Sequence, residues 1–214
     1  LAWSRGLGDV YKRQGLNIAD VLIDRSANLD HLIITNNLTG ETITVDKQFR
    51  SDTPYYKVDQ FNFADGTVLT EAQIEDLADG IVNGTTGNDT LFGSAQAETI
   101  LGDDGNDVLI GNGGDDLLEG GAGDDTYVFR VGDGANTIIE TSGYDYLHFD
   151  DATIAPEDVT YTRVGDDLHV QIASGFIIQD FYSNPDAVVE ELVFSDGQTF
   201  DLTTLLTVIN PIID

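Results

Sequence analysis

Acidic residues recur at a fixed spacing through the middle of the chain, and this pattern is the first feature that could do chemistry. They occupy the sixth position of five consecutive nine-residue segments: Asp89, Glu98, Asp107, Asp116 and Asp125. Carboxylate oxygens are ligands for hard cations, and Ca²⁺ takes about six to eight oxygens in a flexible geometry. Mg²⁺ retains its waters more tightly, so it suits repeated carboxylates less well. The pattern therefore favours the binding of several Ca²⁺ ions over acid–base catalysis.

The same segments carry glycine and a large apolar residue at fixed positions. Each segment begins with glycine: Gly84, Gly93, Gly102, Gly111 and Gly120. Four have glycine at the fourth position: Gly87, Gly105, Gly114 and Gly123. The eighth position is always large and apolar: Leu91, Ile100, Leu109, Leu118 and Tyr127. Glycine lets the backbone turn through positive φ, and one apolar residue per segment cannot be buried unless the copies stack.

Stacking predicts the fold class, which is all-β: a right-handed parallel β-roll in which two segments make one coil, flanked by β-rich related units. Segments n and n+2 then lie above one another. One edge is lined by Asp89, Asp107 and Asp125, and the other by Glu98 and Asp116. Asp145, in a further segment reached after a two-residue insertion, extends the first of these edges as an additional candidate ligand. Carboxylates stacked at strand spacing, about 4.8 Å, repel strongly unless a cation lies between them.

These segments resemble the RTX (haemolysin-type) calcium-binding nonapeptide repeat, GGxGxDxUx, over residues 84–128. The resemblance implies side-chain ligands at Asp89, Asp107, Asp116 and Asp125, and backbone carbonyl ligands in the turns of Gly87, Gly105, Gly114 and Gly123. The second copy departs from the pattern, with Glu98 in place of aspartate and no glycine at its fourth position. We therefore expect the edge of Glu98 and Asp116 to bind less well. The alternative is a glycine-rich solenoid or linker that binds no metal.

Composition limits the partners of the chain. It has 9 Lys+Arg against 39 Asp+Glu in 214 residues, a net charge of −30. Such a chain repels nucleic acid and anionic membrane surfaces and attracts multivalent cations. It has no cysteine, which excludes disulfides and thiolate metal sites. No apolar run approaches the roughly 20 residues that span a bilayer, so we expect no transmembrane segment.

The segments on either side of the repeat resemble each other. Residues 58–66 (VDQFNFADG) match residues 189–197 (VEELVFSDG), and the alternation of apolar and polar residues predicts strands. Both flanks resemble the haemolysin-type calcium-binding-protein-related domain found beside RTX repeats. Their aromatic residues are predicted to lie in the core: Phe61, Phe63, Tyr182 and Phe194. Asp65 and Asp196 precede glycine and are predicted to form turns rather than to bind metal.

The predicted organisation follows from these matches. Residues 71–79 (EAQIEDLAD) are the one segment that predicts a helix, with Thr70 as its N-cap. The expected parts are a related β-rich unit at 15–80, the RTX β-roll at 81–128, a second related unit at 129–201 and a tail at 202–214. The first flank lacks the front half of the second, so we expect a fragment of a longer protein.

The first fourteen residues differ from the rest in composition. They hold the only Trp of the chain and three of its nine basic residues. Residues 9–14 (DVYKRQ) are the translation of GAT GTG TAT AAG AGA CAG, which resembles a transposon-based sequencing adapter. We predict that residues 1–14 are a non-native artefact; the alternative is an ordinary basic N-terminal arm.

No motif in the sequence predicts an enzyme. The three histidines, His31, His148 and His169, are too scattered for an HExxH zinc site. Neither a GxSxG nucleophile elbow nor a GxxxxGK[ST] phosphate loop occurs. Proteins of the resembled family carry their catalytic or toxic chemistry in other domains.

The resemblance implies a calcium-binding β-roll module of a secreted bacterial RTX-type protein, such as a toxin, protease or lipase. Such a module folds on Ca²⁺ outside the cell and leaves through a type I secretion apparatus. We expect an extracellular or cell-surface location. The alternative function is a structural or adhesive spacer in a cell-surface or matrix protein.

Overall fold

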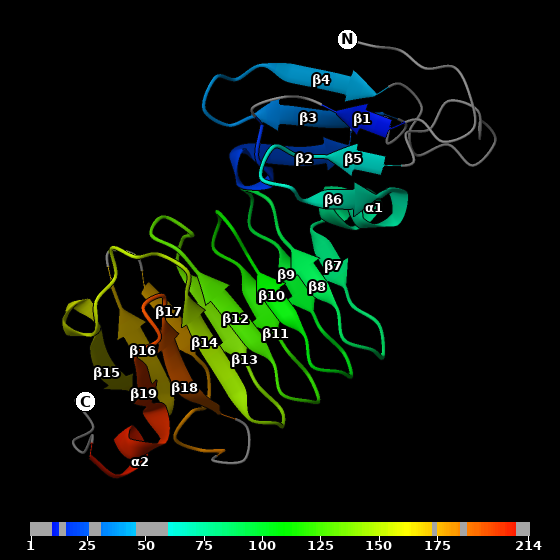
Figure 1. Cartoon of the computed structure of the whole chain (residues 1–214). Helices are drawn as coiled ribbons and strands as arrows, with labels where there is room; N and C mark the ends of the chain where they lie inside the picture. The colour runs from blue at the N-terminus through cyan, green and yellow to red at the C-terminus, as the bar shows by residue number, and fades with distance from the viewer. Residues whose placement is uncertain are drawn as a thin grey trace. The chain divides into compact units, whose positions relative to one another are not determined.

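The computed structural model describes residues 10–12, 16–25, 31–45, 60–172, 175–184 and 188–208 (Figure 1). The chain divides into two compact units, which are described separately. Unit 1 comprises residues 1–81 together with 94–96, and unit 2 comprises residues 82–93 and 97–214.

Unit 1 contains two three-stranded sheets and a helix within its described residues. The first sheet is antiparallel, in the order β2 (Val21–Arg25), β3 (Leu32–Asn36) and β4 (Thr42–Val45), and follows the 3₁₀ helix η1 (Ile18–Asp20). The second has the order β1 (Val10–Lys12), β5 (Gln60–Asn62) and β6 (Val68–Thr70). Unit 1 also takes in 94–96, where the Ala95 N–H donates to the carbonyl of Val21.

The predicted helix is confirmed as α1 (Glu71–Asp79). Thr70 caps its first turn in a capping box: the Thr70 hydroxyl accepts the N–H of Gln73, and the Gln73 side chain accepts the N–H of Thr70. The helix ends at Gly80, whose φ of 74° only glycine adopts at little cost. Its apolar face buries Ile74 and Leu77. The sequence therefore fixes both ends of this helix through local hydrogen bonds.

Unit 2 is built on two sheets whose central strands run parallel and alternate along the chain (Figure 1). One sheet contains β7 (Ile81–Asn83), β9 (Thr99–Leu101), β11 (Leu117–Glu119) and β13 (Asn136–Ile139). The other contains β8 (Thr90–Phe92), β10 (Val108–Ile110), β12 (Thr126–Phe129) and β14 (Asp145–Phe149). Each strand pairs with the strand of the segment two further along. The predicted parallel β-roll, with segments n and n+2 above one another, is confirmed.

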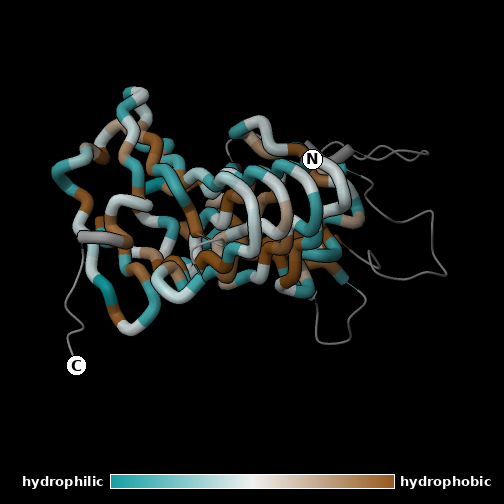
Figure 2. Tube along the Cα trace, turned by 90° about the horizontal axis from the view of Figure 1, so that it is seen from below, coloured by the Kyte–Doolittle hydropathy of each residue, from teal (hydrophilic) through white to brown (hydrophobic). Residues whose placement is uncertain are grey.

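The eighth-position residues form the apolar interior of the coil. One column is Leu91, Leu109, Tyr127 and Leu147, and the other is Ile100, Leu118 and Ile138; all are buried. Figure 2 shows brown strand segments between white and teal turns. Each segment can bury its eighth-position side chain only by packing against neighbouring segments. The stacked columns of these side chains are therefore the core of the coil.

The coil continues beyond the predicted boundary at residue 128. The partners in the last turns lie 20 residues apart, as in Leu118↔Ile138 and Tyr127↔Leu147, instead of 18. The two-residue insertion predicted from the sequence is therefore present, and it falls within residues 130–136. Both sheets then run on into the second flank, through β17 (Gly175–Ile178) and β18 (Val189–Phe194).

The second flank repeats the element order of unit 1. An antiparallel trio, β15 (Thr160–Val164), β16 (Asp167–Gln171) and β17 (Gly175–Ile178), follows the 3₁₀ helix η3 (Pro156–Asp158). A hairpin of β18 (Val189–Phe194) and β19 (Thr199–Asp201) leads into η4 (Leu202–Thr204) and α2 (Leu205–Val208). The same order in unit 1 is β2-β3-β4, then β5-β6, then α1, which supports the predicted duplication. The sequence did not predict α2.

The two hairpins close with the same turn. In the β5–β6 hairpin the carboxylate of Asp65 accepts the N–H of Thr67 at 2.8 Å. In the β18–β19 hairpin Asp196 accepts the N–H of Gln198 at 2.9 Å. The prediction that both aspartates form turns is confirmed. Of the predicted core aromatics, Phe61 and Phe194 are buried, while Phe63 and Tyr182 are half-buried.

Most of the segment predicted to be an artefact lies outside the described residues. Its residues 10–12 form β1, which pairs in parallel with β5. The origin of residues 1–14 stays a prediction, as do the domain boundaries given above.

Candidate metal centres

The turns of the coil fall on two edges. We call the turns that lead from the β7–β13 sheet to the β8–β14 sheet the first edge: residues 84–89, 102–107, 120–125 and 140–145. The turns that lead back form the second edge: residues 93–98, 111–116 and 130–136. The structure places the sixth-position acids on the edges predicted for them, although no measurement yet assigns them as metal ligands.

A ladder of hydrogen bonds joins the sixth positions along each edge. On the first edge the N–H of Asp89 donates to Oδ1 of Asp107, and the N–H of Asp107 donates to Oδ1 of Asp125, both at 2.7 Å. The Asp125 N–H continues the series to Oδ1 of Asp145 at 2.8 Å. On the second edge Asp116 accepts from Glu98 in the same way. Each aspartate thus uses one oxygen to hold the turn before it.

A second ladder runs in the opposite direction through the exposed fifth positions. The side-chain oxygen of Asn88 accepts the N–H of Asn106, and that of Asn106 accepts the N–H of Asp124. Asp124 in turn accepts the N–H of Tyr144 at 2.9 Å. Because the fifth position reaches forward and the sixth reaches back, each turn is fixed to both of its neighbours.

The other oxygen of several sixth-position aspartates is buried without a hydrogen-bond partner. Among the described residues these oxygens are Oδ2 of Asp107, Asp116, Asp125 and Asp145. The carboxylate of Asp107 faces the first glycine of its own turn, where a Cβ added to Gly102 would lie 2.6 Å from Oδ2. The same Cβ would collide with the carbonyl oxygen of Gly120. The first position is therefore glycine because the backbone of the next coil and the aspartate carboxylate fill the space a side chain would need. Unpaired buried carboxylate oxygens are costly unless a cation binds them.

The two N-terminal acids differ from this arrangement. Oδ2 of Asp89 accepts the N–H and the hydroxyl of Thr85, both at 2.7 Å, and the side chain is half-buried. Glu98 is buried and carries one methylene more than the aspartates. The predicted series on the first edge is Asp89, Asp107 and Asp125. The unpaired oxygens belong instead to Asp107, Asp125 and Asp145, one coil further along the chain.

Fourth-position glycines make the close approach between coils. Gly105, Gly114 and Gly123 have φ of 132°, 117° and 129°. A Cβ on Gly123 would collide with the carbonyl of Gly105 in the coil before it. Gly87 lies in the first turn of the edge, and a Cβ there would meet only the Thr85 hydroxyl at 3.9 Å. A carbonyl ligand role for these turns remains a prediction.

Burial raises the pKa of the stacked acids, because removal from water penalises the charged form. It raises the pKa of Asp116 from its usual 3.8 to about 8 and that of Asp125 to about 6. The pKa of Asp107 is also raised, again mainly by burial. The backbone N–H groups that donate to Oδ1 act in the opposite direction but do not outweigh burial. These carboxylates are therefore poorly stabilised as anions by the protein alone.

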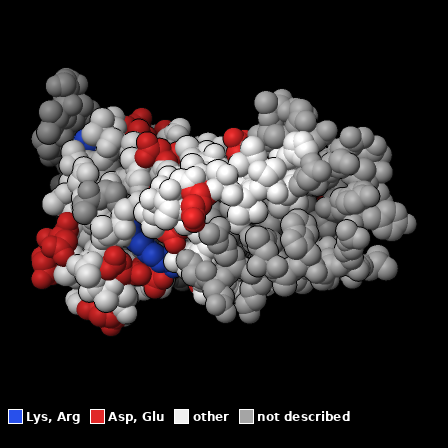
Figure 3. All heavy atoms as spheres, turned by 90° about the horizontal axis from the view of Figure 1, so that it is seen from above, with Lys and Arg blue, Asp and Glu red and all other residues white. Residues whose placement is uncertain are grey.

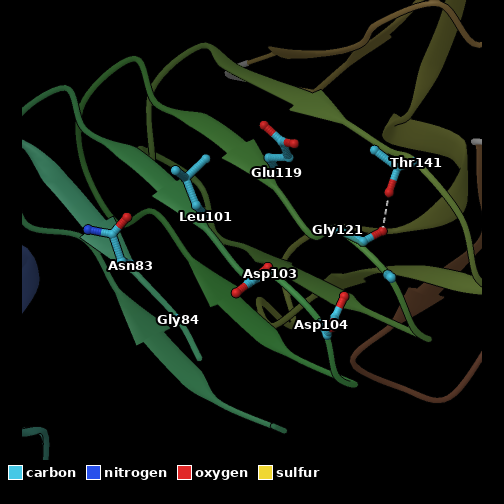
Figure 4. A pocket seen from close by; sticks show the side chains of 9 residues that line it. Asn83, Gly84, Leu101, Asp103, Asp104, Glu119, Gly121 and Thr141 are labelled. Atoms are coloured by element: carbon cyan, nitrogen blue, oxygen red, sulfur yellow. Dashed lines mark hydrogen bonds between the residues drawn. The ribbon is translucent and has the colours of Figure 1, made fainter. Parts of the chain in front are cut away.

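The outer face of the first edge is acidic as well. Figure 4 looks into a groove of about 370 Å³ beside the turns, lined by Asp103 and Asp104, by Glu119 at the end of β11 and by Thr141. The hydroxyl of Thr141 donates to the carbonyl of Gly121 across it. On the described part of the face that Figure 3 draws from above, which is not the groove of Figure 4, red Asp and Glu spheres are also more common than blue Lys and Arg spheres. Such a surface raises the local concentration of cations.

The last turn of the first edge holds acids that are close enough to share an ion. Carboxylate oxygens of Asp125, Glu140 and Asp145 all lie within 4.8 Å of one another, and all three residues are buried. Asp145 was predicted as an additional ligand of this edge. The sequence analysis did not predict Glu140 as a ligand, because it stands at the first position of its segment, where the pattern has glycine.

Family comparisons assign the repeats. Residues 78–109, 92–127 and 101–138 match the RTX calcium-binding nonapeptide repeat, and residues 31–73 match the haemolysin-type calcium binding protein related domain. Residues 78–138 are therefore RTX calcium-binding repeats, and such repeats bind Ca²⁺. The unpaired Oδ2 atoms fit this cofactor, since they supply hard anionic oxygens at a spacing the backbone sets. The second match falls on the flank predicted to be of that kind.

Comparison with solved structures found the extracellular lipase LipA from Serratia marcescens, at 16% sequence identity and a TM-score of 0.28. The match covers 86% of this chain and 33% of the lipase, so the chain spans about a third of that protein. No curated protein matches the chain. Among the described residues, no helix has the length and apolarity needed to cross a bilayer.

Proposed function

We propose that this chain is the calcium-dependent folding module of a secreted bacterial RTX-type protein and that its coil forms only outside the cell, where Ca²⁺ is abundant. The observation that carries the proposal is the stack of buried, unpaired Oδ2 atoms at Asp107, Asp125 and Asp145. Their repulsion opposes coil formation when the acids are ionised. Bound Ca²⁺ supplies the positive charge that offsets this repulsion, so binding free energy becomes folding free energy.

The residues of the chain have separate parts in this process. Oδ1 of each sixth-position aspartate holds the preceding turn through its N–H, as Asp125 holds Asp107 at 2.7 Å. Oδ2 is left for the cation. The eighth-position side chains, such as Leu109, become buried only when the coils stack. A chain with a net charge of −30 and no bound cation therefore stays open, which suits passage through a type I secretion apparatus.

Circular dichroism during a Ca²⁺ titration, after removal of metal with a chelator, tests the folding step. We expect the β signal to be weak in chelator and to rise cooperatively with Ca²⁺. A titration with NaCl at matched ionic strength is the control, because general screening would act there too. Mg²⁺ should restore less signal at the same concentration. A β signal that chelator leaves unchanged would refute the proposal.

Two uses of this module are proposed: part of a secreted enzyme or toxin, or an adhesive spacer. Recovery of the full reading frame separates these cases: a catalytic or pore-forming domain supports the first, and further repeat or adhesion domains support the second. In both cases the part that we propose for this chain is calcium-dependent folding.

A further inference from the structure

The turn at residues 140–145 departs from every other turn of the first edge. It begins with Glu140, where the other three begin with Gly84, Gly102 and Gly120. Its remaining positions follow the repeat, with glycine at the fourth and Asp145 at the sixth. Elsewhere on this edge the first position stands against the carboxylate of the same turn or the backbone of the next coil, which leaves no room for a side chain. Glu140 nevertheless places a full side chain here, 6% exposed.

The Glu140 carboxylate reaches back towards the preceding coil. Its Oε1 accepts the hydroxyl of Tyr127, which in turn accepts the N–H of Gly120 at 2.8 Å. Its Oε2 accepts the N–H of Thr141 at 3.1 Å. This position brings the carboxylate within 4.8 Å of oxygens from Asp125 and Asp145. Three acids from two successive coils therefore meet at one buried point.

The hydrogen bonds of this cluster leave two oxygens without partners. Oδ1 of Asp125 and Oδ1 of Asp145 accept backbone N–H groups, but Oδ2 of each is buried and accepts nothing. Both aspartates are 0% exposed. Arg130 pairs with Asp150 and Arg163 pairs with Asp166, so neither arginine is paired with this cluster. Within the described residues no Lys or Arg forms an ion pair with the three acids, and burying like charges together is strongly unfavourable.

We propose that Asp125, Glu140 and Asp145 together bind one Ca²⁺ ion, with Glu140 as a side-chain ligand that the nonapeptide pattern does not contain. The proposal rests on the proposed function, in that the coil binds calcium at all. It adds that the space between the last two turns of the first edge, which we call a level, has a ligand set that the other levels lack. Three carboxylates converge here, against two at the Asp107–Asp125 level. A higher ligand charge tightens calcium sites, so this site fills at a lower Ca²⁺ concentration than the rest.

Calcium binding measured by calorimetry on the whole chain, after chelation, tests the proposal. Glu140→Gln keeps the size and hydrogen-bonding reach of the side chain and removes its charge. We expect it to weaken the tightest binding step at least about tenfold. Glu157→Gln is the matched control, since it removes the same charge from an exposed residue of η3, and it should change that step less than about twofold.

Glu140→Gly is a second variant that separates loss of the calcium ligand from loss of folding. It restores the residue that begins the other first-edge turns, so the coil should form in excess Ca²⁺ with wild-type dichroism. The tightest step should fall to the affinity of the remaining steps. A tightest step that survives in both Glu140 variants would overturn the proposal.

Terbium luminescence gives an independent measure of proximity. Tb³⁺ replaces Ca²⁺ in oxygen sites and emits when a nearby tyrosine is excited. Because Tyr127 contacts Glu140, we expect Tyr127→Phe to reduce the emission of the first ion bound, and to reduce it less in a Glu140→Gln background. Equal emission with and without Tyr127 would overturn the placement of the ion.

The alternative is that Glu140 stays protonated as a neutral partner of Tyr127. Glu140→Gln would then bind calcium as tightly as the wild type, or more tightly, and the proposal would be wrong. Failure of the proposed function looks different, because the wild type itself would then bind no Ca²⁺.

Discussion

The first and second edges of the coil are made from the same nine-residue unit, yet they stack different numbers of buried carboxylates. On the first edge Asp107, Asp125 and Asp145 each present an unpaired Oδ2. On the second edge, within the described residues, Asp116 alone does so, between a glutamate and an asparagine. The backbone turns and the hydrogen-bond ladder are nevertheless similar on both edges.

This difference separates what the fold needs from what the metal needs. Asn136 ends the second edge, and its amide oxygen accepts the N–H of Asp116 at 2.8 Å, as Oδ1 of an aspartate does. The ladder therefore requires one oxygen at the sixth position, and an amide is sufficient. The second oxygen of an aspartate, with its charge, contributes nothing to the ladder. It is the part of the residue that serves the cation.

The largest expected effect comes from removing the unpaired Oδ2 of Asp125, because this residue lies between two candidate calcium sites of the first edge. Asp125→Asn keeps the Oδ1 bond to Asp107 but removes one charged oxygen from the levels on both sides. We expect the Ca²⁺ concentration at the folding midpoint to rise about 100-fold, equivalent to about 2.7 kcal/mol. Dichroism during a calcium titration measures it. Asp116→Asn on the second edge should raise the midpoint less; equal shifts would remove the difference between the edges.

A glycine substitution tests the shared scaffold rather than the ligands. Gly123→Ala places a Cβ against the carbonyl of Gly105 at a φ of 129°. We expect it to lower the free energy of unfolding in saturating Ca²⁺ by about 2 kcal/mol or more. Gly87→Ala is the control on the same edge, because its Cβ has space, and it should change stability by less than about 0.5 kcal/mol. Urea unfolding of both variants decides the matter; a tolerant Gly123 would contradict the close stacking.

Alanine substitutions compare Asp107 of the first edge with Glu98, the first acid of the second edge. Asp107→Ala removes both the ladder bond to Asp89 and an unpaired oxygen, so we expect about a tenfold weaker calcium midpoint. Glu98→Ala should cost about threefold, because the second edge stacks fewer carboxylates. Isothermal calorimetry on both variants provides the comparison. If Glu98→Ala proved the more damaging, the ranking of the edges would be reversed.

The last expected effect is a difference between the edges in the pH dependence of calcium binding. Burial raises the pKa of Asp116 to about 8, against about 6 for Asp125. Without calcium, protonation of Asp116 favours the fold below its unfolded pKa, and this contribution is lost as the pH rises through about 8. Calcium needs the ionised form, so its affinity on the second edge should fall about fivefold from pH 8 to pH 7. Titrations at both pH values should show a smaller fall in Asp116→Ala than in Asp107→Ala, while Asp145 and Glu140 on the first edge, whose pKa values burial also raises, keep part of the dependence in both variants.

The repeat register could be predicted from the sequence because a nine-residue spacing has one stacked solution. The eighth-position residues, from Leu91 to Tyr127, set the interior, and the sixth-position acids then fall on alternate edges. The two-residue insertion before Asn136 was also visible as a change of spacing. Helix α1 was predictable because Thr70 and Gln73 form its cap locally.

The remaining features depend on contacts between coils, which no local pattern encodes. The Glu140 side chain extends towards the preceding coil and lies beside Gly120, which has no side chain, so its carboxylate comes close to that of Asp125. Thr85 satisfies Oδ2 of Asp89 through its N–H and its hydroxyl, a contact within the turn that the glycine–aspartate pattern does not specify. The reverse ladder through Asn88 and Asn106 arises from a position with no strict residue pattern. These contacts need the stacked geometry before they can be recognised.

The pairing of each segment with the segment two further along limits how such a coil can change its length. Deletion of one nine-residue unit, such as residues 93–101, would transfer every later turn to the opposite edge. Asp107 and Asp125 would take the places of the second edge, and β17 and β18 would have to exchange sheets. Removal or addition of two units, 18 residues, preserves both edges and both attachments. A gene for this coil can therefore lengthen or shorten without rebuilding its ends only in steps of 18 codons.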